Sequence, residues 1–362
     1  MAAQKRIGIL TSGGDCAGLN AAIRAVVHHA IGTYGWEVIG IQEATHGLMH
    51  RPPKSTRLDI EGIDQLLLQG GTILGTTNKG NPFAFPMAGG TFQDRSAEII
   101  AGYHELKLDA LVGIGGDGSL AILRRIANQG NLNLVAIPKT IDNDVGATEL
   151  SIGFDTATNI ATEALDRLHF TAASHSRVMV LEVMGRDAGH IALSAGIAGG
   201  ADIILIPEIP YNLDNVAEKI RQRQAQGKKF CLVMVSEAVR TELGDQVTQI
   251  SQQGEDRYGG IGKYIAEQIA TRTGAESRVT VLGHIQRGGI PSPADRLLGT
   301  VFGVAAVNLI AEEKYDHMVA WKNREVVSVP IAEAIKTYRN VDLHGTLIKT
   351  ARGMGICLGD DY

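Results

Sequence analysis

The chain has 362 residues, 44% of them hydrophobic and 20% charged, a composition typical of a globular protein with two or three domains of about 150 residues. Its net charge of −5 gives no bulk attraction for nucleic acid or an anionic membrane, so an anionic substrate needs a local basic pocket. The three cysteines lack ligand spacing, no charged-then-apolar leader opens the chain, and no apolar run approaches about 20 residues. We therefore expect a protein of the reducing cytoplasm, without structural zinc or a membrane helix.

The first elements in chain order are a strand, a glycine turn and a helix. Residues 6–10 form an apolar run typical of a buried strand, residues 11–15 (TSGGD) form the turn, and helical periodicity covers residues 18–34. Backbone N–H groups of such a turn, together with a helix N-terminus, suit phosphate. The turn matches neither the dinucleotide nor the Walker fingerprint, and a tight strand-to-helix connection explains it equally well.

The alternation of strands and helices continues. We predict a strand over residues 37–42, a short helix over 59–69 that ends at Gly70-Gly71, a polar loop over 72–81, a helix over 96–107 and a strand over 110–113.

A second glycine turn follows this strand and opens a helix that extends to about residue 129. It reads Gly115-Gly116-Asp117-Gly118-Ser119. Glycines let a ligand approach the backbone closely. Asp117 is placed to reach Mg²⁺, which binds one or two carboxylates together with phosphate oxygens. Ser119 has an alternative role as a helix cap. The turn resembles the GGDG turn of phosphofructokinases, NAD kinases and diacylglycerol-type lipid kinases, which narrows the reaction to phosphoryl transfer.

A pair of carboxylates stands at the end of the next apolar strand, residues 132–137. Residues 138–144 read PKTIDND, so Asp142 and Asp144 are two residues apart with Lys139 and Thr140 beside them. Ligands bind at the carboxyl ends of strands in open α/β sheets, and a carboxylate there can accept a proton from a substrate hydroxyl. The structural alternative is a turn, because Asp and Asn bond their own backbone.

The alternation restarts after Asp144 and predicts a second domain. We expect helices over residues 155–170, 189–198, 213–226, about 261–273, 294–313 and 330–339, and strands over 176–183, 203–206, 230–236 and 279–282. Residues 244–260 are polar and glutamine-rich, typical of a surface excursion, and the tail after Arg339 has no clear pattern. Two alternating series predict an α/β protein of two doubly wound domains, with the active site in the cleft between them.

Cationic side chains near predicted strand ends suit a phosphorylated sugar. Arg177, Arg278, His284 and Arg287 provide the cations, and Glu237 provides a hydrogen-bonding group for hydroxyls. His284 and Arg287 are three apart, so one helical turn would present both to one point. Each arginine alone is explained by a surface salt bridge, and His284 alone by a satisfied buried histidine; together they favour a binding site.

Five stretches in this order make the chain resemble bacterial-type 6-phosphofructokinases, and the resemblance extends over nearly the whole length. These stretches are residues 10–15 (LTSGGD), 115–119 (GGDGS), 140–144 (TIDND), 182–186 (EVMGR) and 282–289 (LGHIQRGG).

The resemblance implies transfer of a phosphoryl group from Mg-ATP to the C1 hydroxyl of fructose 6-phosphate. It implies Asp142 as the base, Thr140 and Arg186 at the transferring group, and Asp117 at the magnesium ion. Sugar-phosphate contacts are implied for Thr140, Asp142, Arg177, Met184, Gly185, Arg186, Glu237, Arg278, His284 and Arg287, and nucleotide contacts for Gly14, Gly115, Gly116, Asp117, Gly118 and Ser119.

The resemblance also implies a homotetramer, in which Arg177 and Arg278 reach into a neighbour's pocket. The nucleotide-binding domain would comprise residues 1–153 plus about 288–339, and the sugar-phosphate-binding domain about 154–287 plus 340–362.

Two residues give opposite indications about the phosphoryl donor. Gly118 leaves room for the α-phosphate of ATP, whereas pyrophosphate-using relatives carry aspartate there. Lys139 matches the lysine of those relatives, but a mobile cation assists either donor. Asn78 replaces an arginine found near the ATP phosphates. We expect ATP, with pyrophosphate as the alternative.

Two further hypotheses remain, and one expectation concerns regulation. An NAD-kinase-like enzyme would lack the His284 and Arg287 pair, and an inactive sugar-phosphate sensor would be expected to have lost Asp117, Asp142 or Arg186.

The family's effector site corresponds to positions Arg24, His28, His169, Asp202 and Lys228. Histidine replaces arginine at two of them, so the usual bacterial effector response should be reduced or pH-dependent.

Overall fold

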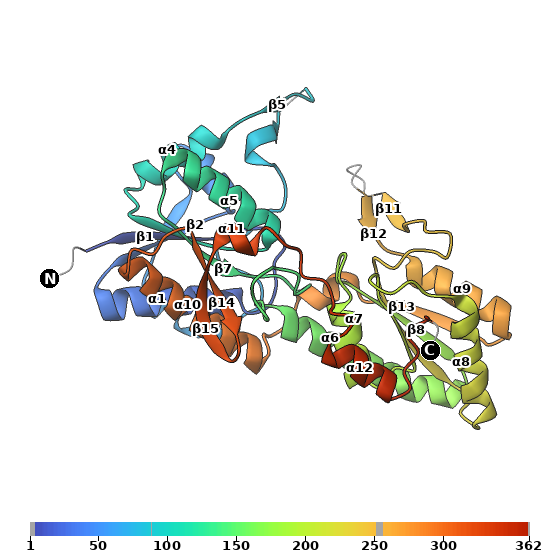
Figure 1. Ribbon diagram of the computed structural model, residues 1–362. Helices are drawn as coiled ribbons and strands as arrows, with labels where there is room; N and C mark the ends of the chain where they lie inside the picture. The colour runs from blue at the N-terminus through green and yellow to red at the C-terminus, as the bar shows by residue number, and fades with distance from the viewer. Residues whose placement is uncertain (1–3, 88, 251–255, 361–362) are drawn as a thin grey trace. The chain divides into compact units, whose positions relative to one another are not determined.

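The computed structural model describes residues 4–87, 89–250 and 256–360 (Figure 1). Residues 251–255 of the predicted surface excursion and the last two residues of the tail lie outside this range. The chain divides into two compact units, Met1–Thr156 with Arg287–Tyr338, and Ala157–Gln286 with Arg339–Tyr362. Each unit contains an open, mostly parallel sheet with helices on its faces, which confirms the predicted α/β fold class.

The first unit contains a seven-stranded sheet in the order β15-β14-β7-β6-β1-β2-β3. β1 lies between β2 and β6 and is parallel to both, so the chain winds outward from β1 in two directions. The gap between β1 and β6 is therefore a topological switch point, where open α/β sheets bind ligands. The strands are β1 (Arg6–Thr11), β2 (Glu37–Ile41), β3 (Ser55–Leu58), β6 (Ala110–Gly115), β7 (Leu134–Pro138), β14 (His317–Lys322) and β15 (Glu325–Pro330).

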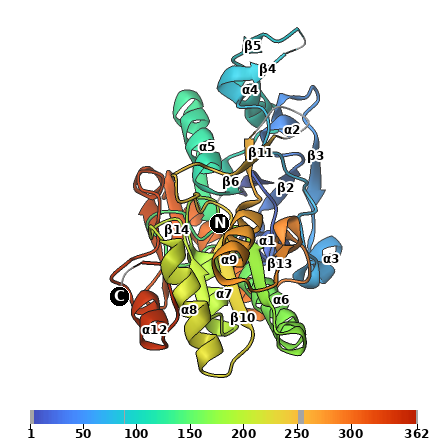
Figure 2. The same ribbon diagram turned by 90° about the vertical axis from the view of Figure 1, so that its right-hand side faces the viewer.

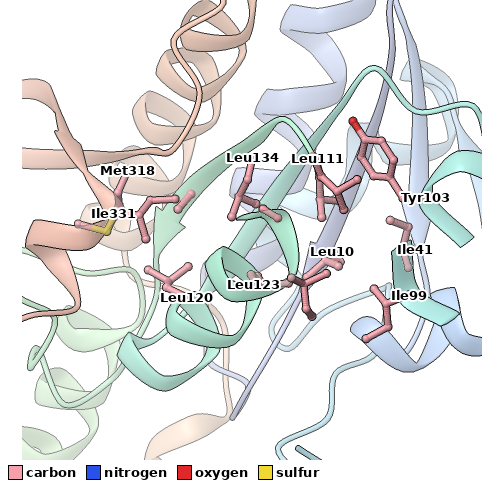
Figure 3. Packing of buried hydrophobic residues seen from close by; sticks show 14 of the residues in the cluster. Leu10, Ile41, Ile99, Tyr103, Leu111, Leu120, Leu123, Leu134, Met318 and Ile331 are labelled. Atoms are coloured by element: carbon pink, nitrogen blue, oxygen red, sulfur yellow. The ribbon is translucent and has the colours of Figure 1, made fainter. Parts of the chain in front are cut away.

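Helices cover both faces of this sheet (Figure 1). One face carries α2 (Thr45–Met49), α4 (Ser96–Glu105), α5 (Asp117–Gly130) and α11 (Ile331–Ala334), and the other carries α1 (Leu19–Tyr34) and α10 (Pro293–Ala311). Leu120 and Leu123 of α5 lie over Leu111 and Leu134 of the sheet, all buried (Figure 3). This apolar layer fixes α5, and with it the second glycine turn, against the sheet.

Helix α10 is the one helix among the described residues that is long and apolar enough to cross a membrane. It nevertheless packs along α1 as a core helix does. A Cβ atom on Gly299 would lie 2.9 Å from the Gly18 carbonyl oxygen, and one on Gly303 would lie 2.7 Å from that of Ala22. These glycines therefore permit close contact between the two helices.

The second unit contains a parallel sheet in the order β13-β8-β10-β9. α8 (Leu213–Ala225) and α9 (Ile261–Thr273) bury one face, α7 (His190–Ala198) packs on the other, and α6 (Phe154–His175) leads into the unit. The tail contributes α12 (Thr346–Gly353) and a bridge from Cys357 to Ile203, so it belongs to this fold. The strands are β8 (Val178–Val183), β9 (Ile203–Leu205), β10 (Cys231–Ser236) and β13 (Ser277–Val281).

Two predicted helices are shorter than expected. The helix over 59–69 is a single turn, α3 (Ile60–Ile63), continued by the 3-10 helix η1 (Asp64–Leu68). Glycine at position 70 is required by a contact with a distant segment and not by a helix end. A Cβ there would lie 2.2 Å from the Gly289 carbonyl oxygen. The helix expected over 330–339 ends at Ala334, because Tyr338 pairs with Val145 instead.

Several small elements were not predicted from the sequence. The pair β14 and β15 forms an antiparallel edge of the first sheet. A hairpin of β4 (Phe85–Pro86) and β5 (Phe92–Gln93), preceded by the 3-10 helix η2 (Pro82–Ala84), extends from the first unit beyond α4 (Figure 2). In the second unit, the polar excursion forms a hairpin of β11 (Thr248–Ile250) and β12 (Asp256–Tyr258).

Candidate active site

The two glycine turns lie side by side at the carboxyl ends of β1 and β6. Ser12 N donates to the Ile114 carbonyl oxygen at 2.9 Å. Ser119 of α5 packs against both turns, because a Cβ on Gly13 would lie 2.9 Å from Ser119 Oγ and one on Gly115 would lie 2.7 Å from Ser119 Cβ. Gly13 also has φ +84°, which favours glycine. The turns therefore form one continuous surface at the switch point.

The N-terminus of α5 is open at this surface. Gly116 is the N-cap and Asp117 the first helical residue, and no side chain caps the helix, so Ser119 is not the cap. Gly118 is exposed, and a Cβ there would meet no atom within 4 Å. The first N–H groups of a helix lack intrahelical partners and carry a partial positive charge. This end of α5 can therefore receive a phosphate, with the carboxylate of Asp117 beside it.

The segment after β7 is bonded to both turns through Lys139. Its N–H donates to the Gly115 carbonyl oxygen at 2.9 Å, and its ammonium donates to the Gly14 carbonyl oxygen. Only 4% of Lys139 is exposed, and loss of hydration lowers the pKa of its ammonium. Lys139 thus lies against the surface formed by the two glycine turns, and its side chain holds it there.

Thr140 and Asp142 form a buried pair directly beyond Lys139. Asp142 N donates to Thr140 Oγ1 at 3.1 Å, and that hydroxyl donates to Asp142 Oδ2 at 3.3 Å. Asp142 is 2% exposed. The threonine therefore fixes the orientation of a carboxylate that can take a proton from a hydroxyl.

Asn143 forms the turn that was the structural alternative for this segment, and the turn leaves Asp142 available as a candidate base. Its φ is +54°, a conformation that asparagine tolerates, and its side chain is fixed on both sides. Nδ2 donates to the Glu149 carbonyl oxygen at 3.2 Å, and Oδ1 accepts from Ser151 Oγ at 3.0 Å. Asn143 therefore makes the turn that presents Asp142.

Asp295, which sequence reasoning missed, supports this segment from behind. Its carboxylate is 1% exposed and accepts from Gly153 N and Thr156 N, each at 2.8 Å. Ile152, next to Gly153, pairs with Lys139. Burial raises the pKa of Asp295, against the effect of these bonds. The sequence signal was Ser292-x-x-Asp295 at the start of α10, in which Ser292 Oγ caps the helix by accepting from Asp295 N; the partners of the Asp295 carboxylate are not visible in sequence.

In the second unit, the loop after β8 is held by two side chains. Glu237 Oε1 accepts from Gly185 N at 3.3 Å and from Arg186 N at 3.1 Å, and Gln286 Oε1 accepts from Met184 N at 2.8 Å. Arg186 is exposed, with φ +49°. Glu237, predicted to bind a sugar hydroxyl, therefore also fixes the backbone of the loop that carries Arg186.

The four predicted cations do not gather in either unit. His284 is exposed in the 3-10 helix η3 (Gly283–Arg287), which excludes a buried histidine. Arg287 belongs to the first unit, where its Nη1 donates to the Asp15 carbonyl oxygen at 2.9 Å. A Cβ on Gly14 would lie 2.7 Å from the same Nη1, so Gly14 leaves room for this guanidinium.

Arg177 and Arg278 lie at the amino ends of the strands of the second sheet, whereas Arg186 lies beyond a carboxyl end. Arg177 precedes β8 and Arg278 is the second residue of β13, whereas Arg186 follows β8. Six residues of strand, about 20 Å, separate the two ends. Both arginines contact Glu276, Arg177 at 3.0 Å, and this contact with Arg177 chiefly lowers the pKa of Glu276.

Within residues 4–87, 89–250 and 256–360, no group of three or more His, Cys, Asp or Glu side chains is placed to hold a metal ion. A single carboxylate such as Asp117 beside a phosphate-binding helix end matches how Mg²⁺ is bound, since this ion takes most of its ligands from phosphate and water.

A family profile and a full-length relative both match phosphofructokinases. The sequence profile of the family described as Phosphofructokinase matches residues 6–310. The chain is 82% identical over 357 residues to "ATP-dependent 6-phosphofructokinase 1" of Synechocystis sp., with 99% of each chain covered.

Solved structures share the fold. Phosphofructokinase from Saccharomyces cerevisiae matches with a TM-score of 0.77 and 28% identity, covering 98% of this chain, which spans 47% of the yeast chain. A pyrophosphate-dependent phosphofructokinase from Marinobacter aquaeolei matches with a TM-score of 0.80 and 19% identity, covering 99% of this chain and 93% of the other. By its sequence profile and its relatives, the chain belongs to the phosphofructokinase family.

Proposed function

We propose that the protein transfers the γ-phosphoryl group of ATP to the C1 hydroxyl of fructose 6-phosphate, giving fructose 1,6-bisphosphate and ADP. The relative from Synechocystis sp., 82% identical, carries the name of this activity with ATP as donor. The observation that carries the proposal is the attachment of Lys139 to both glycine turns, because it joins the Thr140 and Asp142 pair to the turns that we propose bind phosphate.

The first unit would bind the donor. Gly14, the turn from Gly115 to Ser119 and the N-terminus of α5 offer backbone N–H groups to the phosphates. Asp117 would hold Mg²⁺, which when bound neutralises charge on the phosphates. Open space at Gly118 leaves room for the α-phosphate, which supports ATP over pyrophosphate.

Three side chains would perform the transfer. Asp142, oriented by Thr140, accepts the proton of the C1 hydroxyl as that oxygen attacks the γ-phosphorus. Arg186 would donate hydrogen bonds to the transferring group, whose negative charge is spread over its oxygens, and the Thr140 hydroxyl would turn its one proton from Asp142 to that group when it is bound. Asp117, Asp142 and Arg186 are all present, which disfavours an inactive sugar-phosphate sensor.

The second unit would bind fructose 6-phosphate through Met184, Gly185, Glu237 and His284, while Arg287 contributes from the first unit. Arg177 and Arg278 lie about 20 Å of strand away from Arg186, too far to serve the same pocket. This separation supports a homotetramer in which they complete a neighbour's site. Mixing inactive Asp142→Asn chains with inactive Arg278→Ala chains should restore activity in hybrid oligomers, and equally inactive mixtures would exclude a shared site.

The cytoplasm is the compartment we propose for this activity. All three cysteines, Cys16, Cys231 and Cys357, are free and buried, which fits a reducing environment.

Replacement of Asp142 by Asn tests the assignment of the base. The change keeps the shape and the hydrogen bond to Thr140 but removes the basic oxygen. We expect kcat to fall by about 10²–10⁴-fold with fructose 6-phosphate binding largely intact. Formation of fructose 1,6-bisphosphate in a coupled assay measures this, and near-wild-type turnover would remove the assignment.

A further inference from the structure

We propose that Tyr258, in the polar excursion after β10, is a positioning residue for Arg186 and acts through Asp187. The proposal rests on the proposed function, in which Arg186 contacts the transferring phosphoryl group. It gives a role to a segment whose composition indicated only a solvated surface.

The contact itself joins the excursion to the loop after β8. The Tyr258 hydroxyl donates a hydrogen bond to Asp187 Oδ1. Gln246, also in the excursion, forms a side-chain hydrogen bond with the same tyrosine. Asp187 is the residue next to Arg186, so any displacement of Asp187 displaces the backbone from which the arginine side chain extends.

Tyr258 is fixed to the same strand that carries the loop. Glu182 in β8 is 2% exposed, and its carboxylate accepts from Gly260 N at 3.0 Å and from Gly262 N at 2.8 Å. Gly259 N donates to the Val247 carbonyl oxygen at 3.3 Å. The chain on the C-terminal side of Tyr258 is therefore anchored to β8, and the tyrosine connects this anchor to Asp187.

Other bonds hold the backbone of the loop on both sides of Asp187: after it, Ala188 N donates to the Gly185 carbonyl oxygen at 3.1 Å and Gly189 N to Glu208 Oε1 at 3.0 Å. Gln286 holds Met184 N, and Glu237 holds Gly185 N and Arg186 N. Arg186 has φ +49°, a conformation that non-glycine residues keep only where their surroundings impose it. These are bonds to backbone N–H groups, whereas the bond from Tyr258 restrains the side chain of Asp187 and so adds a restraint directly after Arg186.

Positioning of this kind affects catalysis more than binding. The arginine must meet charge that develops in the transition state, and a misplacement of about 1 Å can cost about 10²-fold in rate. A loop that is loosened but not unfolded would still bind substrates. Loss of the Tyr258 hydroxyl should therefore lower kcat and leave KM almost unchanged.

Tyr258→Phe is the direct test, because it removes only the hydroxyl. We expect kcat to fall by about 3–30-fold, with KM for ATP and for fructose 6-phosphate within about twofold of the unmodified protein. Tyr211→Phe is the matched control, since its hydroxyl donates to the Arg240 carbonyl oxygen at 2.8 Å in the same unit. The control should lose no kcat, and an unchanged kcat in Tyr258→Phe would overturn the proposal.

Two further comparisons separate positioning from general structural damage. In an Arg186→Ala background, Tyr258→Phe should lower kcat no further, whereas an equal fractional loss in both backgrounds would overturn the proposal. Asp187→Ala should lose as much as Tyr258→Phe, and the double variant no more than either. Additive losses would contradict action through Asp187, and this comparison remains decisive if Tyr258→Phe folds poorly. Full activity in Arg186→Ala would instead contradict the proposed function.

Discussion

The ammonium of Lys139, which follows β7, donates a hydrogen bond to the carbonyl oxygen of Gly14 in the glycine turn that follows β1. The lysine is 4% exposed, so its cation is engaged with protein backbone at the edge of the phosphate surface. In sequence, Lys139 indicated pyrophosphate as donor. In the structure it joins the two glycine turns that we propose as the donor site, a role that either donor would require.

Replacing Lys139 should therefore slow catalysis without changing the preferred donor. We expect Lys139→Gly and Lys139→Met to lower kcat with ATP by about tenfold, because the first turn loses its contact with the Thr140 segment. Lys139→Met keeps most of the volume and so separates loss of the cation from loss of packing. Steady-state rates with ATP and with pyrophosphate provide the measurement, and a variant that prefers the other donor would show that Lys139 selects it.

Gly118→Asp should depress ATP use severely while leaving the fold intact. The space at Gly118 is open, so the new carboxylate would project toward the α-phosphate. Like charges about 4 Å apart near a protein surface repel by about 4 kcal/mol, which predicts a loss in kcat/KM for ATP of about 10³-fold. Gly118→Ala is the control and should retain far more ATP activity. Equal losses in the two variants would mean that volume, not charge, decides.

His190 predicts a loss of stability in mild acid. Its imidazole is buried, which lowers its pKa to about 4, and its Nε2 lies 2.9 Å from the Arg339 carbonyl oxygen. An unfolded histidine takes up its proton near pH 6.5, so between these values the unfolded state binds more protons and stability falls as pH falls. A shift of this size corresponds to about 3 kcal/mol.

Thermal unfolding measured between pH 7 and pH 5 tests this prediction. His190→Gln keeps an amide donor for the Arg339 carbonyl oxygen but cannot titrate, so its Tm should depend less on pH over this range. Identical pH dependence in both proteins would contradict the assignment.

Histidines at the expected effector positions predict a pH-dependent response to phosphorylated effectors. His28 Nε2 lies 2.9 Å from Asp64 Oδ1, and Arg24 contacts the same carboxylate at 3.6 Å. In the other unit His169 packs against the ring of Phe230. Histidine lacks the planar, permanently charged fork with which arginine binds phosphate, so inhibition by phosphoenolpyruvate should be reduced relative to the usual bacterial response or should depend on pH.

Inhibition curves at several pH values check this expectation, with His104→Gln as a control for a histidine elsewhere. Strong inhibition that is independent of pH, yet lost on replacing His28 and His169, would contradict it.

Local chemistry made the placement of the two glycine turns and of Asp142 predictable. The two glycine turns and the buried Asp142 each follow an apolar strand, and parallel strands bring their carboxyl ends together. The sequence also allowed Arg177 to be separated from the residues at the carboxyl ends of strands. It precedes the apolar run of β8 and therefore lies at the amino end of that strand.

Other features depend on contacts between distant segments. Asp295 holds Gly153, and Tyr258 reaches Asp187, and no pattern within either segment reveals its partner. The helix expected over residues 330–339 fails for the same reason, since tertiary pairing of Tyr338 with Val145 overrides helical propensity.

The central claim is phosphorylation of fructose 6-phosphate by ATP, and kcat/KM of the unmodified protein for ATP and for pyrophosphate tests it most directly. Both donors are assayed with saturating fructose 6-phosphate and magnesium, with formation of fructose 1,6-bisphosphate as the readout. We predict a clearly higher value for ATP, because no atom lies within 4 Å of a Cβ built on Gly118, which leaves room there in the proposed donor site. A higher value for pyrophosphate, or no fructose 1,6-bisphosphate from either donor, would contradict the claim.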